Sequence, residues 1–501
     1  MLSSSAPDAL PPVPPQSLAS PRDDAALARL AEAARADLAR LNFPPVHWVP
    51  PAVAPDGAPV LDALVVGAGM CGQTAAYALL REGVANLRVI DRARRGDEGP
   101  WGTFARMVTL RSPKHLTGPD LGVPSLTFRA WYEAQHGAAG WDALHKVGRI
   151  DWRDYLLWVR DVVRLPVEND TSLVSVDDAP GLLRIGLRTP RGDQTVWARK
   201  LVLALGRDGS GAPRWPAYPS LRREAAHARV FHSADAIDFD AWRGKRVGVL
   251  GAGASAFDNA ACALEAGAAQ VVLFARRKLL PQVNKSKWTS FTGFLRGYEA
   301  LDDARKWRFY TYIFDEQVPP PWETVRRCDA HEAFELRLGE TWLDVRPDAG
   351  GVTVETSKGT ERFDAVVFGT GFDVALPDRG ELTRYAPFVE TWERHVTPEQ
   401  AARHPEPARF PYLGPGFELR STDPAHAAAM GRMHLFNWGS TMSHGALAGD
   451  IPGLQIGARR LAEAIVRDLF VEDADAHWAR LQAHEEPELI ATRWYVPPEG
   501  R

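Results

Sequence analysis

The sequence predicts an α/β protein with two Rossmann-like dinucleotide-binding domains and an N-terminal helical extension. Two segments, 62–91 and 246–277, each contain a short apolar strand, a glycine-rich turn, a helix and a second strand. Further apolar strands end in glycine at Gly206 and Gly371, as expected for strands that return to a parallel sheet. This order along the chain predicts that the second domain is inserted into the first.

The 62–91 segment contains the complete G-x-G-x-x-G fingerprint at Gly67, Gly69 and Gly72. The first glycine permits a tight turn, the second lets the backbone approach a pyrophosphate, and the third lets helix and strand pack closely. The expected strand, helix and second strand cover residues 63–66, 75–80 and 87–90. Asp91 follows that second strand, where a carboxylate accepts hydrogen bonds from ribose hydroxyls.

The 246–277 segment repeats this pattern with an alanine in the third position. Gly251, Gly253, Ser255 and the following Ala256 form a G-x-G-x-x-A turn, an accepted variant of the fingerprint. The strands are expected at 246–250 and 271–274, with a helix at 257–266 between them. The second strand leads into Arg276 and Arg277 rather than an acid. Arginine at this position accommodates the 2′-phosphate of NADP, so this segment predicts an NADPH site.

Composition and charge exclude several other classes of protein. The chain has 501 residues, 45% of them hydrophobic and 24% charged, which is ordinary for a globular enzyme. A net charge of −4 gives no broad basic field for nucleic acid or anionic lipid. The three cysteines, Cys71, Cys262 and Cys328, are too few for a disulfide framework, and no metal-ligand spacing occurs. Without a signal peptide or an apolar run long enough to span a bilayer, we expect a cytoplasmic protein without a membrane partner.

The expected domain limits follow from these patterns. Residues 1–58 form an N-terminal extension, partly disordered, with an amphipathic helix at 23–41 that packs on the main body or on a second subunit. The first dinucleotide-binding domain comprises 59–215 and 366–501. The NADPH-binding domain comprises 216–365 and contains an insertion at 281–330 with a helix at 302–314.

Other elements are expected from local pattern. The loop 96–104 is rich in Gly, Pro and Trp, which predicts either a rigid aromatic surface beside the cofactor or a plain surface turn. A helical pattern surrounds Trp152. Strands are expected at 173–176, 183–187, 195–198, 200–206, 341–345, 351–355 and 363–372, and a helix at 454–470. The strand at 363–372 is expected to carry the chain back toward the first domain.

These motifs together resemble the class B flavin monooxygenases, a group of flavin-containing, N-hydroxylating and Baeyer–Villiger enzymes. The resemblance covers about residues 60–465 and is carried by the two glycine turns, Asp91, Asp258 with Arg276, and the Phe368-Gly-Thr-Gly-Phe372 segment. The linker fingerprint of the family is only partly met: His232 and Ser233 are in place, but Ala226 and Ala228 occupy its aromatic and glycine positions.

The resemblance implies FAD at the first unit and NADPH at the second. NADPH would reduce FAD, O2 would form a C4a-(hydro)peroxyflavin, and a small molecule would be oxygenated, most readily at nitrogen or sulfur. The expected cofactor-binding residues are Gly67, Gly69, Met70, Gly72, Asp91, Arg92, Trp101, Val174, Gly206, Gly251, Gly253, Ser255, Arg276, Arg277, Thr370, Gly371 and Gly445.

Two residues are candidates for catalysis, Arg111 and Asn284. Flavin-containing monooxygenases have an asparagine before a Ser-Pro-Lys-like stretch, whereas this chain has Arg111 before Ser112-Pro-Lys114. A guanidinium there suits an anionic substrate or the flavin, and it equally suits a structural salt bridge. Asn284, with Lys285 and Lys287, closely follows the second unit and could contact NADP or substrate.

Other functions stay open at this point. Baeyer–Villiger oxidation of a ketone is one, and a non-oxygenating flavin NADPH oxidoreductase is another. The widely spaced cysteines disfavour a disulfide reductase, which needs a redox cysteine pair. A nucleotide-sensing protein would leave two cofactor units unexplained. The expected partners are O2 and a small molecule, with self-association open.

Overall fold

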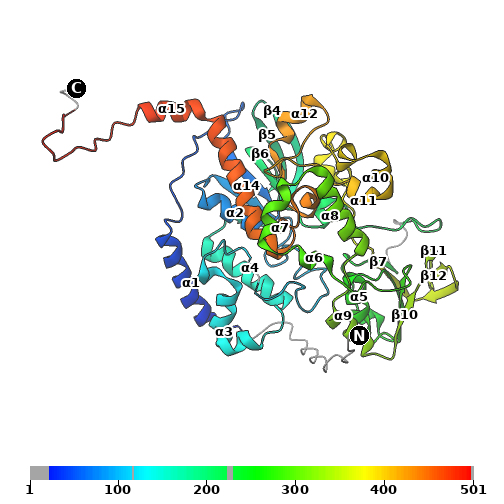
Figure 1. Cartoon of the computed structure of the whole chain (residues 1–501). Helices are drawn as coiled ribbons and strands as arrows, with labels where there is room; N and C mark the ends of the chain where they lie inside the picture. Colours follow the sequence, from blue (N-terminus) through cyan, green and yellow to red (C-terminus); the bar gives the residue numbers. More distant parts are fainter. Residues whose placement is uncertain (1–21, 116–117, 223–228, 498–501) are drawn as a thin grey trace, which may run out of the picture.

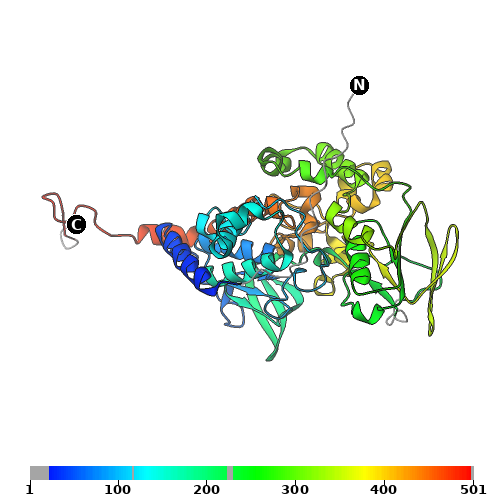
Figure 2. The ribbon, with the colours of Figure 1, turned by 90° about the horizontal axis from the view of Figure 1, so that it is seen from below.

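The computed structural model describes residues 22–115, 118–222 and 229–497. The expected disorder of residues 1–21 and the linker positions Ala226 and Ala228 lie outside these ranges. Figures 1 and 2 show an elongated molecule in which a sheet-and-helix unit built largely from the first part of the chain lies at one end and a second unit, with strands β7 to β12, lies at the other.

The first sheet has seven strands in the order β3-β2-β1-β6-β5-β4, with β15 also pairing with β6. Its strands are β1 (Val60–Val66), β2 (Leu87–Ile90), β3 (Val167–Glu168), β4 (Ser172–Ala179), β5 (Leu182–Thr189), β6 (Gly192–Leu203) and β15 (Met433–Leu435). The two strands expected at 195–198 and 200–206 are wrong, because β6 runs through both as one long strand. Its first half pairs with β5 and its second half with β1, so one strand serves two neighbours in succession.

Parallel pairing sets the cofactor edge of this sheet. Strand β1 pairs in parallel with β2 and β6, so the residues that follow them, Gly67, Asp91 and Ala204, emerge at one edge. Helix α2 (Met70–Arg81) covers the sheet and is buried over most of its length. Helix α14 (Ile451–Glu472) packs against α2, as Figure 1 also shows.

The second sheet has five parallel strands in the order β10-β9-β8-β14-β7. They are β7 (Val230–His232), β8 (Arg246–Leu250), β9 (Gln270–Ala275), β10 (Phe334–Leu338) and β14 (Ala365–Phe368). The expectation that the strand around 363–372 leads back to the first domain needs correction. Strand β14 lies inside the second sheet beside β8, and the crossing to the first unit begins only after Phe368. A small antiparallel sheet of β11 (Trp342–Asp348), β12 (Gly351–Thr356) and β13 (Gly359–Phe363) completes this unit.

Helices cover these sheets and fill the space between the two units. The remaining helices are α1 (Asp24–Arg40), α3 (Phe128–Ala143), α4 (Arg149–Val163), α5 (Ala254–Glu265), α6 (Lys285–Trp288), α7 (Thr292–Gly297), α8 (Asp303–Glu316), α9 (Trp322–Asp329), α10 (Pro398–Arg403), α11 (Pro405–Ala408), α12 (Pro424–Met430), α13 (Thr441–His444) and α15 (Ala474–Gln482). The predicted insertion thus contributes α6 to α9, while α15 extends away from the body in Figures 1 and 2.

The N-terminal helix α1 is held on the main body. The Asp23 carboxylate caps it by accepting a hydrogen bond from the Ala26 N–H, as expected for an acid at this position. Its apolar face, including Leu27 and Leu38, is buried against α3 and α4. Of the two roles expected for this helix, the structure therefore shows packing on its own chain. Among the described residues, no helix is both long and apolar enough to cross a bilayer.

Candidate active site

The first glycine turn has the close packing that its fingerprint predicts. Gly67 has a φ of +100°, and a Cβ atom there would lie 2.4 Å from the carbonyl oxygen of Ala204. A Cβ atom at Gly72 would lie 1.7 Å from the carbonyl oxygen of Gly67. Only glycine lets α2 approach the turn this closely. No side chain caps the N-terminus of α2, whose N-cap residue is Gly69, so its first N–H groups face the turn.

Asp91 is built into the same turn. Its carboxylate accepts hydrogen bonds from the Ala68 N–H at 2.7 Å and from the Ala93 N–H at 2.8 Å. Burial raises the pKa of Asp91, and these two N–H groups oppose that rise. The carboxylate thus fixes the loop geometry at the strand end from which a ribose would be held.

The loop with Trp101 covers the first glycine turn. The Cα atom of Gly99 lies 3.8 Å from the position that a Cβ atom at Gly69 would take. Trp101 is buried, and its indole N–H has no hydrogen-bond partner among the described residues. This arrangement favours the rigid loop beside the cofactor over the plain surface turn.

The second glycine turn is more open. Gly251 packs on β14, because a Cβ atom there would lie 2.5 Å from the carbonyl oxygen of Gly369. Gly253 is exposed, with no atom within 4 Å of its Cβ position, and no side chain caps α5 behind it. Arg276 is exposed at the end of β9, whereas Arg277 is half-buried and donates to the backbone oxygen of Asp315 at 3.1 Å.

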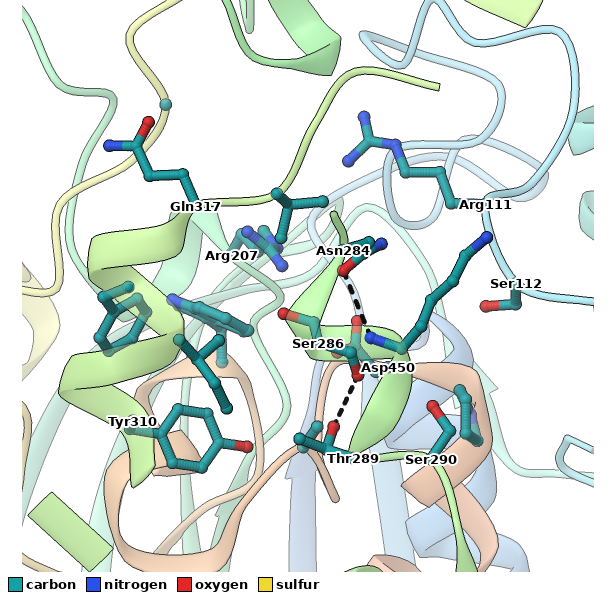
Figure 3. Close-up of a pocket in the computed structure, with 18 of the residues that line it drawn as sticks. Arg111, Ser112, Arg207, Asn284, Ser286, Thr289, Ser290, Tyr310, Gln317 and Asp450 are labelled. Atoms are coloured by element: carbon teal, nitrogen blue, oxygen red, sulfur yellow. Dashed lines mark hydrogen bonds between the residues drawn. The ribbon is translucent and has the colours of Figure 1, made fainter. Parts of the chain in front are cut away.

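One cavity of about 420 Å³ lies between the two units. Segments between residues 111 and 452 line it: the loop after Trp101, the ends of β6 and β14, helices α6 and α8, and the start of α14. Figure 3 shows polar side chains from these segments around one space. Its lining residues are Arg111, Ser112, Pro113, Arg207, Arg214, Asn284, Ser286, Lys287, Thr289, Ser290, Leu295, Tyr310, Ile313, Phe314, Gln317, Val318, Thr370, Gly371, Phe372, Glu406, Trp438, Ala446, Asp450 and Pro452.

Both catalytic candidates from the sequence line this cavity. Arg111 is exposed, and its guanidinium lies 3.9 Å from a carboxylate oxygen of Asp258 on α5. Asn284 caps α6 through its side-chain oxygen, which accepts from the Lys287 N–H at 3.3 Å. A contact of 3.9 Å is a loose ion pair, so the Arg111 guanidinium can also face the cavity.

Asp258 and His232 support the fold rather than face a cofactor. Asp258 is buried, accepts from the Thr324 hydroxyl at 2.9 Å, and lies 3.4 Å from Arg327. Burial raises the pKa of Asp258, and Arg111 and Arg327 counteract this rise. His232 is buried at the end of β7, with its Nε2 3.0 Å from the Gly371 oxygen.

The other residues expected from the sequence lie in varied surroundings. Arg92 is paired with Asp208, Met70 begins α2, and Gly206 follows β6 with a φ of +70°. Thr370 and Gly371 line the cavity, and the Thr370 hydroxyl donates to the Arg214 backbone oxygen. Val174 is exposed on β4, and Gly445 packs against the ring of Tyr298.

Sequence reasoning missed most of the residues that line the cavity, among them Arg207, Tyr310, Trp438 and Asp450. Arg207 directly follows Gly206 at the end of a predicted strand, so a cation at a strand end was the available signal. Tyr310 and Trp438 belong to segments without a recognisable motif, and only the fold brings them together.

Part of the chain matches a known family, and solved structures share its fold. Residues 64–291 match a family model described as pyridine nucleotide-disulphide oxidoreductase. The fold is similar to an ornithine hydroxylase from Pseudomonas aeruginosa, with a TM-score of 0.63 and 17% identity over 82% of this chain and 100% of that one. It is also similar to L-lysine 6-monooxygenase from Pseudomonas syringae, with a TM-score of 0.61 and 19% identity over 81% and 99% of the chains.

A sequence relative then defines the family. The FAD-dependent urate hydroxylase of Xanthomonas campestris pv. campestris is 42% identical over 477 residues, which are 95% of this chain and 99% of the relative. The chain therefore belongs to the class B flavin-dependent monooxygenases. Membership of this family confirms the predicted fold class, the predicted flavoprotein oxidoreductase, and FAD and NADP as the predicted cofactors.

The residues of the first unit fit FAD. The tight Gly67–Gly72 turn, the uncapped N-terminus of α2 and the unpartnered Trp101 N–H all lie where the pyrophosphate and flavin would pass. Among the described residues, no group of His, Cys, Asp or Glu side chains could hold a metal ion.

Proposed function

We propose that this enzyme is an NADPH- and O2-dependent monooxygenase that inserts one oxygen atom of O2 into a small molecule. The reaction consumes NADPH, a proton, O2 and substrate, and releases NADP⁺, water and the oxygenated product. When bound, FAD accepts a hydride from NADPH and then activates O2. The observation that carries the proposal is that a single cavity is lined by segments that follow both glycine turns, so both cofactors can reach it.

The protein residues would bind and position the reactants. The first turn would hold FAD through the backbone N–H groups of α2, and Asp91 would keep that turn in shape. Arg276 would bind the 2′-phosphate of NADPH. The apolar wall formed by Leu295, Ile313 and Phe314 would limit the access of water to the reacting atoms.

Urate is the first substrate that we propose. The relative described above is a urate hydroxylase, and 99% of its length aligns with this chain. Oxygenation of an amine at nitrogen is the second candidate, since the solved ornithine and lysine enzymes share the fold. Asp450 gives this candidate one supporting observation. Of the two acids in the cavity, Glu406 is already paired with Arg214 at 2.7 Å, which leaves Asp450 to attract an ammonium group.

Features of the described residues argue against a thiol-dependent reductase. Cys71, Cys262 and Cys328 are free, and burial raises the pKa of each thiol, which disfavours a reactive thiolate. Free thiols also suit a reducing, cytoplasmic location.

The test is to follow NADPH and O2 consumption by the purified enzyme with urate, L-ornithine, L-lysine and a cyclic ketone, and to measure peroxide release. We expect urate to increase NADPH oxidation and to disappear in proportion to it, with little peroxide. Coupled loss of an amine instead would support the second candidate. NADPH oxidation that yields only peroxide with every compound would contradict the monooxygenase proposal, and coupled lactone formation would support the Baeyer–Villiger alternative.

A further inference from the structure

Two hydrogen-bond donors in the cavity have no acceptor within the described part of the chain. The first is Arg207, which is exposed to the cavity and makes no ion pair or hydrogen bond with a described residue. Its neighbour Asp208 is already paired with Arg92 at 2.7 Å. A guanidinium has five N–H groups, and leaving them without acceptors in a protein cavity is unfavourable.

The second donor is the hydroxyl group of Tyr310 on α8. Tyr310 is 3% exposed, and its hydroxyl group has no hydrogen-bond partner among the described residues. Burial and the nearby Asp450 carboxylate raise the pKa of Tyr310, so the hydroxyl group stays protonated and can donate a hydrogen bond. Figure 3 shows Tyr310 and Arg207 among the side chains that line the same cavity.

The position of Arg207 is fixed by an aromatic ring. Its guanidinium carbon lies 3.9 Å from the centroid of the Trp438 ring, a cation–π contact that occupies one face of the guanidinium. The edges of the group remain available to a ligand in the cavity. Loss of hydration next to the surrounding protein lowers the pKa of Arg207, and the nearby Asp450 carboxylate opposes this change.

From these contacts we infer that Arg207 and Tyr310 bind the acceptor oxygens of an anionic, planar oxo-heterocycle, the substrate class to which urate belongs. The Asp450 carboxylate would accept a ring N–H of the same molecule, since such heterocycles present N–H groups beside their carbonyl groups. This inference rests on the proposed function for the reaction itself, but it makes a separate claim about which ligands the cavity binds.

Arg214 provides a matched control. It lines the same cavity, but its Nε lies 2.8 Å from Asp373 and its terminal nitrogen lies 2.7 Å from Glu406, so its guanidinium is neutralised. If charge anywhere in the cavity were sufficient, Arg214→Gln and Arg207→Gln would weaken ligand binding equally. If binding depends on the unpaired donor, Arg207→Gln should weaken it far more than Arg214→Gln.

The experiment measures the Kd of urate and of hypoxanthine, a neutral purine, from the change in flavin absorbance of the oxidised holoenzyme without NADPH. We expect the wild-type enzyme to bind urate more tightly than hypoxanthine. Arg207→Gln should raise the Kd of urate at least about 30-fold, Arg207→Lys and Tyr310→Phe about tenfold, and Arg214→Gln less than about threefold. FAD content and NADPH oxidation without substrate are measured for each variant.

Each other outcome has a definite meaning. A lower FAD content in Arg207→Gln, with an unchanged Kd for urate in the fraction that retains FAD, would assign Arg207 to the flavin and overturn the inference. Equal effects in Arg207→Gln and Arg214→Gln would also overturn it, as would a wild-type enzyme that does not bind urate. Tight urate binding without coupled oxygenation would leave the inference standing and contradict the proposed function instead.

Discussion

The two glycine turns share one backbone plan but differ in how the protein surrounds them. At the first, the Gly99–Trp101 loop covers Gly69, and Asp91 is buried and bonded to the turn itself. At the second, Gly253 is exposed with no protein atom near its Cβ position, and Arg276 projects from the strand end. The first turn is therefore an enclosed site and the second is an open one.

This difference matches the two roles that the cofactors have in a flavin monooxygenase. A cofactor that stays bound through many turnovers benefits from an enclosed site that excludes water. A hydride donor must enter and leave in each cycle, which an open turn allows. The same fingerprint can therefore suit a resident or an exchanging cofactor, depending on the loops that surround it.

The largest effect on stability and FAD binding should come from Gly72→Ala in the first turn, for which Gly253→Ala in the second turn is the matched comparison. In Gly72→Ala the new methyl group would lie 1.7 Å from the Gly67 oxygen, so helix α2 must move away from β1. We expect loss of bound FAD and a destabilisation above about 4 kcal/mol. Gly253→Ala meets no protein atom, so it should keep its FAD and its Tm and raise only the KM for NADPH.

Flavin absorbance of the purified variants and thermal unfolding followed by circular dichroism check this contrast. If Gly253→Ala lost FAD as Gly72→Ala does, the second turn would be as enclosed as the first, and the comparison would fail.

The turns themselves were predictable from the sequence because their chemistry is local. A glycine is required where a Cβ atom would collide with a neighbouring backbone oxygen, and Gly67 and Gly72 meet that condition through contacts within one strand–helix unit or with the adjacent strand. Strands of parallel sheets are short apolar runs, so β1, β2, β8 and β9 were also predictable. The single long β6 was not, because its second half pairs with β1, which is far away in the sequence.

The cavity could be predicted only in part. Arg111 and Asn284 stood near recognisable motifs, whereas Tyr310 and Trp438 come from segments 128 residues apart that carry no motif. Their juxtaposition results from packing between the insertion and the C-terminal part of the chain. The sequence also could not show whether Arg207 forms an ion pair, because this depends on which carboxylates the fold brings near it.

A second difference between the units concerns buried charge. Asp62 stands five residues before Gly67 and Arg246 five residues before Gly251. Arg246 is paired with Glu361 at 2.7 Å, but Asp62 is 1% exposed and one of its carboxylate oxygens has no hydrogen-bond partner among the described residues. Burial raises the pKa of Asp62 to about 6, although His47 and Arg199 favour the charged form and Asp473 opposes it.

The raised pKa predicts a pH dependence of stability. The folded protein binds the Asp62 proton more tightly than the unfolded chain, whose pKa is near 3.8. This contribution to stability is complete below about pH 4, falls as the pH rises to about 6, and is absent above that value. Asp62→Asn should remove this dependence and raise the free energy of unfolding at pH 7 by about 3 kcal/mol.

Urea unfolding of the wild type and of Asp62→Asn between pH 4 and pH 8 measures this difference. Asp24→Asn, an exposed change at the start of α1, serves as the control and should follow the wild-type curve. Parallel curves for wild type and Asp62→Asn would show that Asp62 stays charged in the folded protein.

The smallest effects should come from substitutions of the two arginines that follow β9. The relative sizes of their effects on the KM for NADPH test whether the second site is open. Arg276 is exposed and has no described partner, whereas Arg277 already donates to the Asp315 backbone oxygen. Charge-assisted hydrogen bonds to a phosphate are worth about 1.5–3 kcal/mol, so Arg276→Ala should raise the KM for NADPH at least about tenfold. Arg277→Ala should raise this KM about threefold, because one of its N–H groups already donates to a backbone oxygen of the protein.

Neither variant should change the KM for NADH, which lacks the 2′-phosphate, or the FAD content. Steady-state kinetics with both nucleotides test this, and an equal loss with NADH would mean that the arginines support the strand end rather than bind the phosphate.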